Sequence, residues 1–103
     1  MGHREDALLT IQEAVKLCRK LAADQPAAFN PDHAMSLQSL SLCLFYLGHR
    51  EDALITIQEA VKLYKQLAAE RPTVFNSFLE GSLSVLLDCQ SDLDSQEDAQ
   101  EQV

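Results

Sequence analysis

The residues of this chain that could do chemistry are scattered. A histidine stands near carboxylates twice, at His3 and His49, in two copies of Gly-His-Arg-Glu-Asp. Histidine beside acids suits metal binding or proton transfer. Each copy, however, offers one histidine and two adjacent acids, and adjacent residues diverge by about 100° around a helix. We therefore expect a solvated turn followed by an acidic first helical turn. His33, beside Asp32, is likewise expected to be an exposed helix start.

Nucleophiles and cofactor motifs are equally dispersed. The cysteines Cys18, Cys43 and Cys89 lie 25 and 46 residues apart, without C-x-x-C spacing. Their apolar helical contexts indicate small buried side chains in a reducing compartment. Gly81-Ser82 lacks the strand and second glycine of a nucleophile elbow, and the chain has no glycine-rich phosphate loop. We expect no enzyme activity, no catalytic residue, no cofactor and no metal site.

The net negative charge of the chain disfavours two classes of partner, nucleic acids and membranes. The 103 residues carry a net charge of −8. Residues 1–71 hold nine acids and eight bases, whereas residues 72–103 hold seven acids and no base. An acidic body repels phosphate and anionic lipid, so neither nucleic acid nor a membrane is an expected partner. No apolar run approaches the ~18 residues of a membrane span, and no secretory segment follows Met1, so the expected location is cytoplasmic.

An internal repeat organises the chain. Residues 2–47 match residues 48–93 at 26 of 46 positions. The first part of the unit is almost invariant, because residues 2–17 and 48–63 differ at one position only. A period of this length is typical of repeat architectures in which each unit is one supersecondary element. We therefore take residues 1–93 as one repeat segment.

Each unit is expected to consist of two helices. Apolar residues recur at steps of three and four, the period of an amphipathic helix. The predicted helices cover residues 5–24, 33–47, 51–70 and about 78–89. Asp32 is the predicted N-cap of the second helix, and Gly48 is its predicted left-handed C-terminal residue. Residues 94–103 are polar and acidic without an apolar stripe, and are expected to form a disordered tail.

The spacing of these residues resembles the signature of the tetratricopeptide repeat (TPR) family. The positions that carry the resemblance are Leu37, Leu40, Gly48, Ala53, Ile57 and Ala60, with a closing Pro72. The 46-residue period resembles the long TPR subtype of kinesin light chain. The resemblance implies an all-α solenoid of antiparallel helical hairpins, in the order B-A-B-A, where small residues such as Ala53 and Ala60 are buried between paired helices.

The resemblance also implies a function. TPR proteins are non-catalytic scaffolds that present a concave surface, lined by their first-type (A) helices, to a peptide or helix of a protein partner. In kinesin-light-chain-like repeats a Leu-Asn-Asn-Leu run faces that groove, and here the run reads Leu37-Gln38-Ser39-Leu40. The expected partner-binding residues are Gln38, Leu42, Phe45 and Tyr46. Two alternatives are a self-associating structural unit and a regulatory repeat fragment of a larger multidomain protein.

The order of helices gives a reason for self-association. Helix 5–24 carries nearly the same apolar arc as helix 51–70. Helix 51–70 is flanked by first-type helices on both sides, whereas helix 5–24 is flanked only by helix 33–47. Repeat helices bury their faces only against neighbours. We therefore expect a homodimer through helix 5–24, which Ile11→Asp or Val15→Asp would shift towards monomer.

Overall fold

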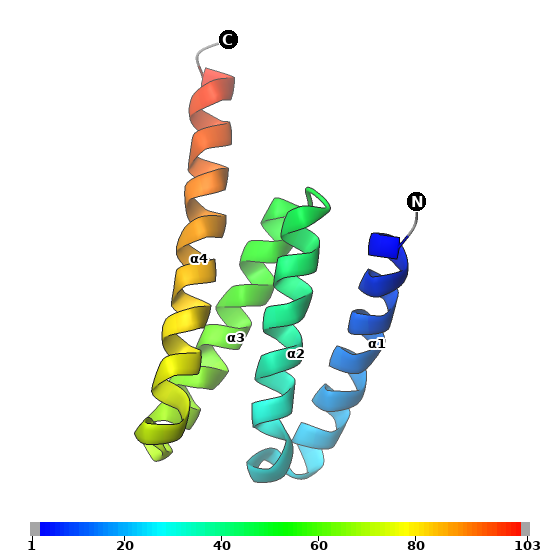
Figure 1. Ribbon diagram of the computed structural model, residues 1–103, viewed down its shortest axis with the longest axis vertical. Helices are drawn as coiled ribbons and strands as arrows, with labels where there is room; N and C mark the ends of the chain where they lie inside the picture. Colours follow the sequence, from blue (N-terminus) through cyan, green and yellow to red (C-terminus); the bar gives the residue numbers. More distant parts are fainter. Residues whose placement is uncertain (1–2, 102–103) are drawn as a thin grey trace.

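The computed structural model describes the backbone of residues 3–101 and the side chains of residues 6–93. This part of the chain is all α-helix, without a strand. The four helices are α1 (His3–Asp24), α2 (Pro26–Tyr46), α3 (Arg50–Glu70) and α4 (Pro72–Glu101). Each runs antiparallel to the one before it, so that the fold consists of consecutive helical hairpins (Figure 1). The predicted all-α hairpin architecture is confirmed.

The turn between α2 and α3 follows from one glycine. Gly48 has a φ of 89°, the left-handed conformation that glycine adopts at little cost. Two hydrogen bonds close the helix end: the Gly48 amide donates to the Phe45 carbonyl at 3.1 Å, and the His49 amide donates to the Leu44 carbonyl at 2.9 Å. This is the Schellman arrangement, which satisfies carbonyls that the last helical turn leaves unpaired. The predicted role of Gly48 is confirmed.

The other two turns are copies of each other. Gln25 and Arg71 precede α2 and α4 with nearly the same backbone angles, φ −134° and ψ 74° against φ −136° and ψ 76°. Pro26 and Pro72 follow as the first residues of those helices. Proline suits this position, because its φ is preset for a helix and its missing N–H would be unpaired there anyway. Pro72 therefore closes α3, as predicted, and also opens α4.

Two predicted helix starts were too late. α2 begins at Pro26, so Pro31 lies inside the helix and Asp32 is not its N-cap. A proline this close to the N-terminus removes one hydrogen bond but does not end the helix. α4 begins at Pro72 instead of near residue 78. The added first turn of α4 is stabilised by Phe75, which packs against the buried cluster of Ala34, Tyr64 and Leu67.

α4 is also longer than predicted at its C-terminal end. It reaches Glu101 and so runs through most of the segment expected to be a disordered tail. Asp92 of α4 forms an ion pair with Arg50, the first residue of α3, through Oδ2 and Nε. The side chains from residue 94 onward lie outside the described residues, and the expectation of a disordered tail over residues 94–103 stays a prediction.

The core lies where α2, α3 and α4 meet. All the apolar positions of the repeat signature on α2 and α3 are buried, as are both small residues predicted to sit between paired helices. The buried set is Leu37, Leu40, Leu44, Ala53, Ile57 and Ala60. Close packing of helices at about 8–10 Å requires small side chains at the crossing points. The predicted burial of Ala53 and Ala60 is confirmed.

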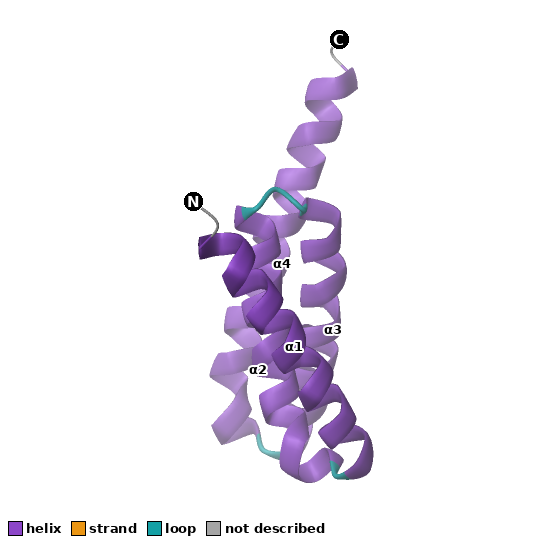
Figure 2. Cartoon of the chain, turned by 90° about the vertical axis from the view of Figure 1, so that its right-hand side faces the viewer, coloured by secondary structure: helices purple, strands orange, loops and turns teal. Residues whose placement is uncertain are grey.

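α1 stands at one edge of this arrangement. It packs along α2, and within the described residues it touches α3 only through side chains, at Val15 in the core and through an ion pair of Arg19 (Figure 1). Figure 2 views the molecule from that side and shows α1 in front, with no helix covering it. The side of α1 that faces away from α2 is therefore open in the described part of the chain.

Candidate functional site

Identical residues have different surroundings in α1 and α3. Ala53, Ile57 and Ala60 of α3 have exposed fractions of 0%. Their counterparts one repeat earlier are the same residue types, yet Ala7 and Ala14 are exposed and Ile11 is only half-buried. Local sequence cannot cause this difference, because residues 2–17 and 48–63 differ at a single position. The difference arises because α2 covers this flank of α3, whereas no helix within the described residues covers the same flank of α1.

The opposite side of the two helices is buried to the same extent in α1 and in α3. Val15 and Val61 are 4% and 5% exposed, and Ala22 and Ala68 are both 7% exposed. These pairs are buried by the helix that follows, which is α2 for α1 and α4 for α3. The covering helix without a counterpart is therefore the preceding one, the position that α2 occupies on α3. Val15 belongs to the core, so Val15→Asp would disturb folding as well as any assembly, and Ile11→Asp is the variant that tests assembly.

The uncovered flank of α1 forms a groove with α2. The groove has a volume of about 320 Å³ and an apolar floor. Its lining residues are Ile11, Ala14, Asp32, Met35, Ser36 and Ser39. Met35 is exposed, and its flexible thioether side chain is of the kind that adapts to varied partners. We name this groove the α1–α2 groove.

A basic and apolar strip continues along α1. A second hollow of about 610 Å³ is lined by Lys16, Leu17, Arg19, Lys20 and Ala23. Leu17 and Leu9 are 58% and 60% exposed, although leucine is usually buried. Exposed apolar residues rimmed by charge are typical of interaction surfaces. This strip lies on the same uncovered helix as the α1–α2 groove.

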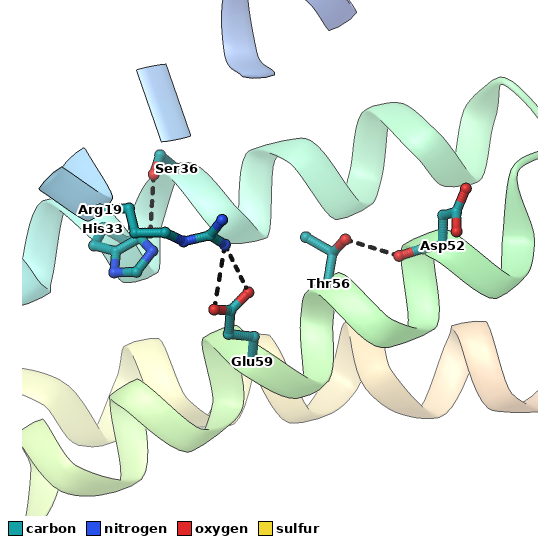
Figure 3. Close-up of polar contacts among 6 residues, drawn as sticks. All are labelled: Arg19, His33, Ser36, Asp52, Thr56 and Glu59. Atoms are coloured by element: carbon teal, nitrogen blue, oxygen red, sulfur yellow. Dashed lines mark hydrogen bonds and ion pairs between the residues drawn. The ribbon is translucent and has the colours of Figure 1, made fainter. Parts of the chain in front are cut away.

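One ion pair joins α1 to α3 across the hairpins. Arg19 Nη2 lies 3.3 Å and 3.2 Å from the two carboxylate oxygens of Glu59 (Figure 3). Both side chains are about half exposed, at 56% and 44%, so solvent screens the pair and its contribution to stability is small. The pair directs the Arg19 guanidinium towards α3, whereas Lys16 and Lys20 are exposed on α1.

His33 lies beside this ion pair and is buried, so the expectation of an exposed helix start was wrong (Figure 3). The reason is that α2 begins seven residues earlier, which places His33 in the helix interior. Burial lowers the pKa of His33 below its usual value; Glu59 opposes this shift and Arg19 adds to it. Its Nε2 has no hydrogen-bond partner within the described residues. His33 is therefore a neutral core residue at physiological pH.

The four predicted partner-binding residues do not form one exposed patch. Gln38 is half-buried, and its side-chain oxygen accepts a hydrogen bond from Ser82 Oγ at 2.9 Å. Leu42 and Phe45 are half-buried, and Phe45 packs against the core. Tyr46 is 68% exposed and makes an edge-to-face contact with Phe45 at 5.9 Å. Tyr46 is thus the most accessible of the four.

Two other reactive groups, the Cys89 thiol and the Tyr64 hydroxyl, belong to buried residues. Burial raises the pKa of Cys89, and the neighbouring Asp88 and Asp92 raise it further, so this thiol stays protonated. Burial also raises the pKa of Tyr64, whose ring stacks on Phe78. Within the described residues no three histidine, cysteine, aspartate or glutamate side chains are grouped as a metal ion would need.

Comparison with known proteins identifies no relative. No protein-family model matches the chain, and no curated protein or solved structure does. In the described region, none of the helices has the length and apolar character needed to cross a membrane. The function must therefore be inferred from the geometry of the chain.

Proposed function

We propose that this protein is a non-catalytic protein-interaction scaffold of TPR-like helical hairpins, and that it binds a helix of a protein partner along the uncovered flank of α1. One observation carries the proposal. Ala14 and Ile11 are exposed or half-buried, whereas Ala60 and Ile57, the same residues one repeat later, are completely buried by a packed helix. The flank is built to receive a helix, because its copy already holds one.

The rigid position of the groove favours such binding. Apolar area removed from water contributes about 25 cal/mol per Å², and a standard interface covers about 800 Å² on each partner. The groove belongs to a hairpin whose opposite flank is packed at Val15 and Ala22, so little backbone ordering is needed when a ligand binds. A partner helix inserts side chains between residues that are already positioned.

A selection of displayed helical peptides on the intact chain tests this proposal. Sequences enriched on the wild-type chain should be lost on Ala14→Arg, because the long charged side chain blocks the groove. They should be retained on Ser84→Arg, an equally large change at an exposed position of α4. Failure to enrich any sequence that depends on Ala14 would refute the proposal.

Self-association through α1 is a second candidate function. The observation that favours it is the exposure of Leu9 and Leu17, two large apolar residues on the uncovered helix. Two copies could bury these residues against each other in an isologous dimer. Sedimentation velocity over a hundredfold range of concentration separates the two candidates, because a module that binds only other proteins stays monomeric throughout.

A further inference from the structure

The second repeat shows how a helix sits in the copy of the α1–α2 groove. The residues of α3 and α4 that correspond to the groove include Ile57, Ala60 and Ser82, and the helix that covers them is α2. Ser82 is fully buried, and its hydroxyl donates to Gln38 Oε1 of α2 at 2.9 Å. Gly81 lies beside the same side chain, because a Cβ added there would lie 4.0 Å from Gln38 Nε2, an ordinary van der Waals distance. α2 is thus an internal model of a groove ligand.

The first repeat has the same donor without the acceptor. Ser36 is the counterpart of Ser82 and lines the α1–α2 groove. Its hydroxyl donates to the His33 carbonyl of its own helix at 2.8 Å (Figure 3). A serine that bonds back to its own helix can rotate towards a better acceptor. An incoming helix with a glutamine at the right position would give Ser36 the bond that Ser82 has.

We propose that the groove selects an amphipathic helix with the residue pattern of α2, bound antiparallel to α1, in which a glutamine accepts a hydrogen bond from Ser36. This inference rests on the proposed function and specifies its ligand. The pattern is small–Leu–Gln–Ser–Leu, spaced as Ala34, Leu37, Gln38, Ser41 and Leu44 are in α2. Ala34 and Ser41 are fully buried, so the ligand needs small residues at those positions, and leucine fills the other two.

A second copy of this chain does not offer that pattern on α4. The α4 residues at the corresponding positions are Glu80, Leu83, Ser84, Leu87 and Gln90. Glu80 would bring a carboxylate where Ala34 is completely buried, and an unpaired buried charge is strongly unfavourable. Leu87 would overfill the space that Ser41 occupies, and Ser84 is too short to reach Ser36. A second copy of this chain is therefore not expected to fill the groove through α4, and the proposed ligand is a helix that carries the residue pattern of α2.

Charge adds a preference at one end of the ligand. Gln66 of α3 shares a hollow with Pro26 and Ala27, the first residues of α2. The counterpart of Gln66 in α1 is Lys20. A ligand helix placed as α2 is placed would bring its first turn near Lys20, where acidic residues are also favoured by the helix dipole. We expect acidic residues in the first turn of the ligand to tighten binding.

The test uses a synthetic peptide of residues 26–47 as the probe and fluorescence anisotropy on the intact chain. The peptide should bind, and a peptide of residues 72–93 should not. In low salt, the substitution Ala27→Glu in the peptide should increase its affinity. Gln38→Ala in the peptide and Ser36→Ala in the protein should each weaken binding by about three- to tenfold, the range of one hydrogen bond. Because they remove the same bond, the two losses should not multiply. Independent losses would overturn the hydrogen-bond assignment.

Two further variants make the outcome decisive. Ala14→Arg should abolish peptide binding, whereas binding that survives Ala14→Arg would mean that the peptide displaces α2 itself, and would refute the proposal.

A second measurement avoids the cost of folding a free peptide. A copy of residues 26–47 joined directly before Gly2 recreates the natural junction, because Gly2-His3 repeats Gly48-His49. The extended chain should protect the amides of α1 from exchange at least tenfold more than the original chain does.

The outcomes separate the two levels of the proposal. If neither the peptide nor the joined copy engages α1, the α2-like ligand pattern is wrong. If displayed peptides that lack this pattern still depend on Ala14, the interaction function stands and only the ligand class is overturned.

Discussion

Ala14 and Ala60 allow a stability comparison in which the local sequence is held constant. Both lie in the identical segment Ile-Gln-Glu-Ala-Val-Lys-Leu, so Ala→Leu changes helix propensity equally at the two sites. Ala60 has no exposed surface, and three added carbon atoms must displace packed neighbours. Overpacking of this kind costs about 1–3 kcal/mol. Ala14 is exposed, so Ala14→Leu should change the free energy of unfolding by less than about 0.5 kcal/mol.

Urea unfolding followed by circular dichroism measures both free energies, and thermal melts provide a check. Since about 1 kcal/mol shifts Tm by about 4–8 °C in a domain of this size, a cost of about 1–3 kcal/mol means that Ala60→Leu should lower Tm by about 4–24 °C. A neutral Ala60→Leu would show that the helix register is wrong. An Ala14→Leu as destabilising as Ala60→Leu would show that the α1 flank is covered in solution. Repeating the melts at several protein concentrations would then show whether a second copy is the cover.

Three other predictions use the same unfolding assays. Burial lowers the pKa of His33 in the folded state, so the unfolded chain binds a proton at a higher pH than the folded chain does. The free energy of unfolding should therefore be constant above about pH 6.5 and decrease as the pH falls from there towards the folded-state pKa. His33→Leu, which copies the residue at position 79, should flatten that fall, and equal pH profiles would contradict the assignment. Deleting residues 94–103 should leave the urea midpoint unchanged, and their amides should exchange fast; protected amides would indicate docking. If the chain dimerises through α1, Tm should rise with concentration and Ile11→Asp should abolish the rise, whereas Ser84→Asp should not.

The helical hairpins could be predicted from the sequence because the information is local. Steps of three and four between apolar residues place Leu37, Leu40 and Leu44 on one face whatever the helix packs against. The turn at Gly48 is equally local, since only glycine adopts a positive φ at little cost. Burial of Ala53 and Ala60 followed from the repeat pattern. The starts of α2 and α4 were misplaced because a proline can either end a helix or open one, and the local residues do not distinguish the two.

The candidate site depends on what packs where, which the residues of one segment do not contain. Ala14 and Ala60 have the same neighbours in sequence, but only the tertiary structure places α2 over Ala60 and leaves Ala14 open. Gln38 was predicted to face a ligand, and the fold instead pairs it with Ser82 of α4. The sequence thus determined helices, turns and apolar faces, because these follow from backbone sterics and periodicity. The tertiary structure decided which of two identical helix faces stays exposed, because the burial of a residue depends on the helices that pack against it and not on its own type.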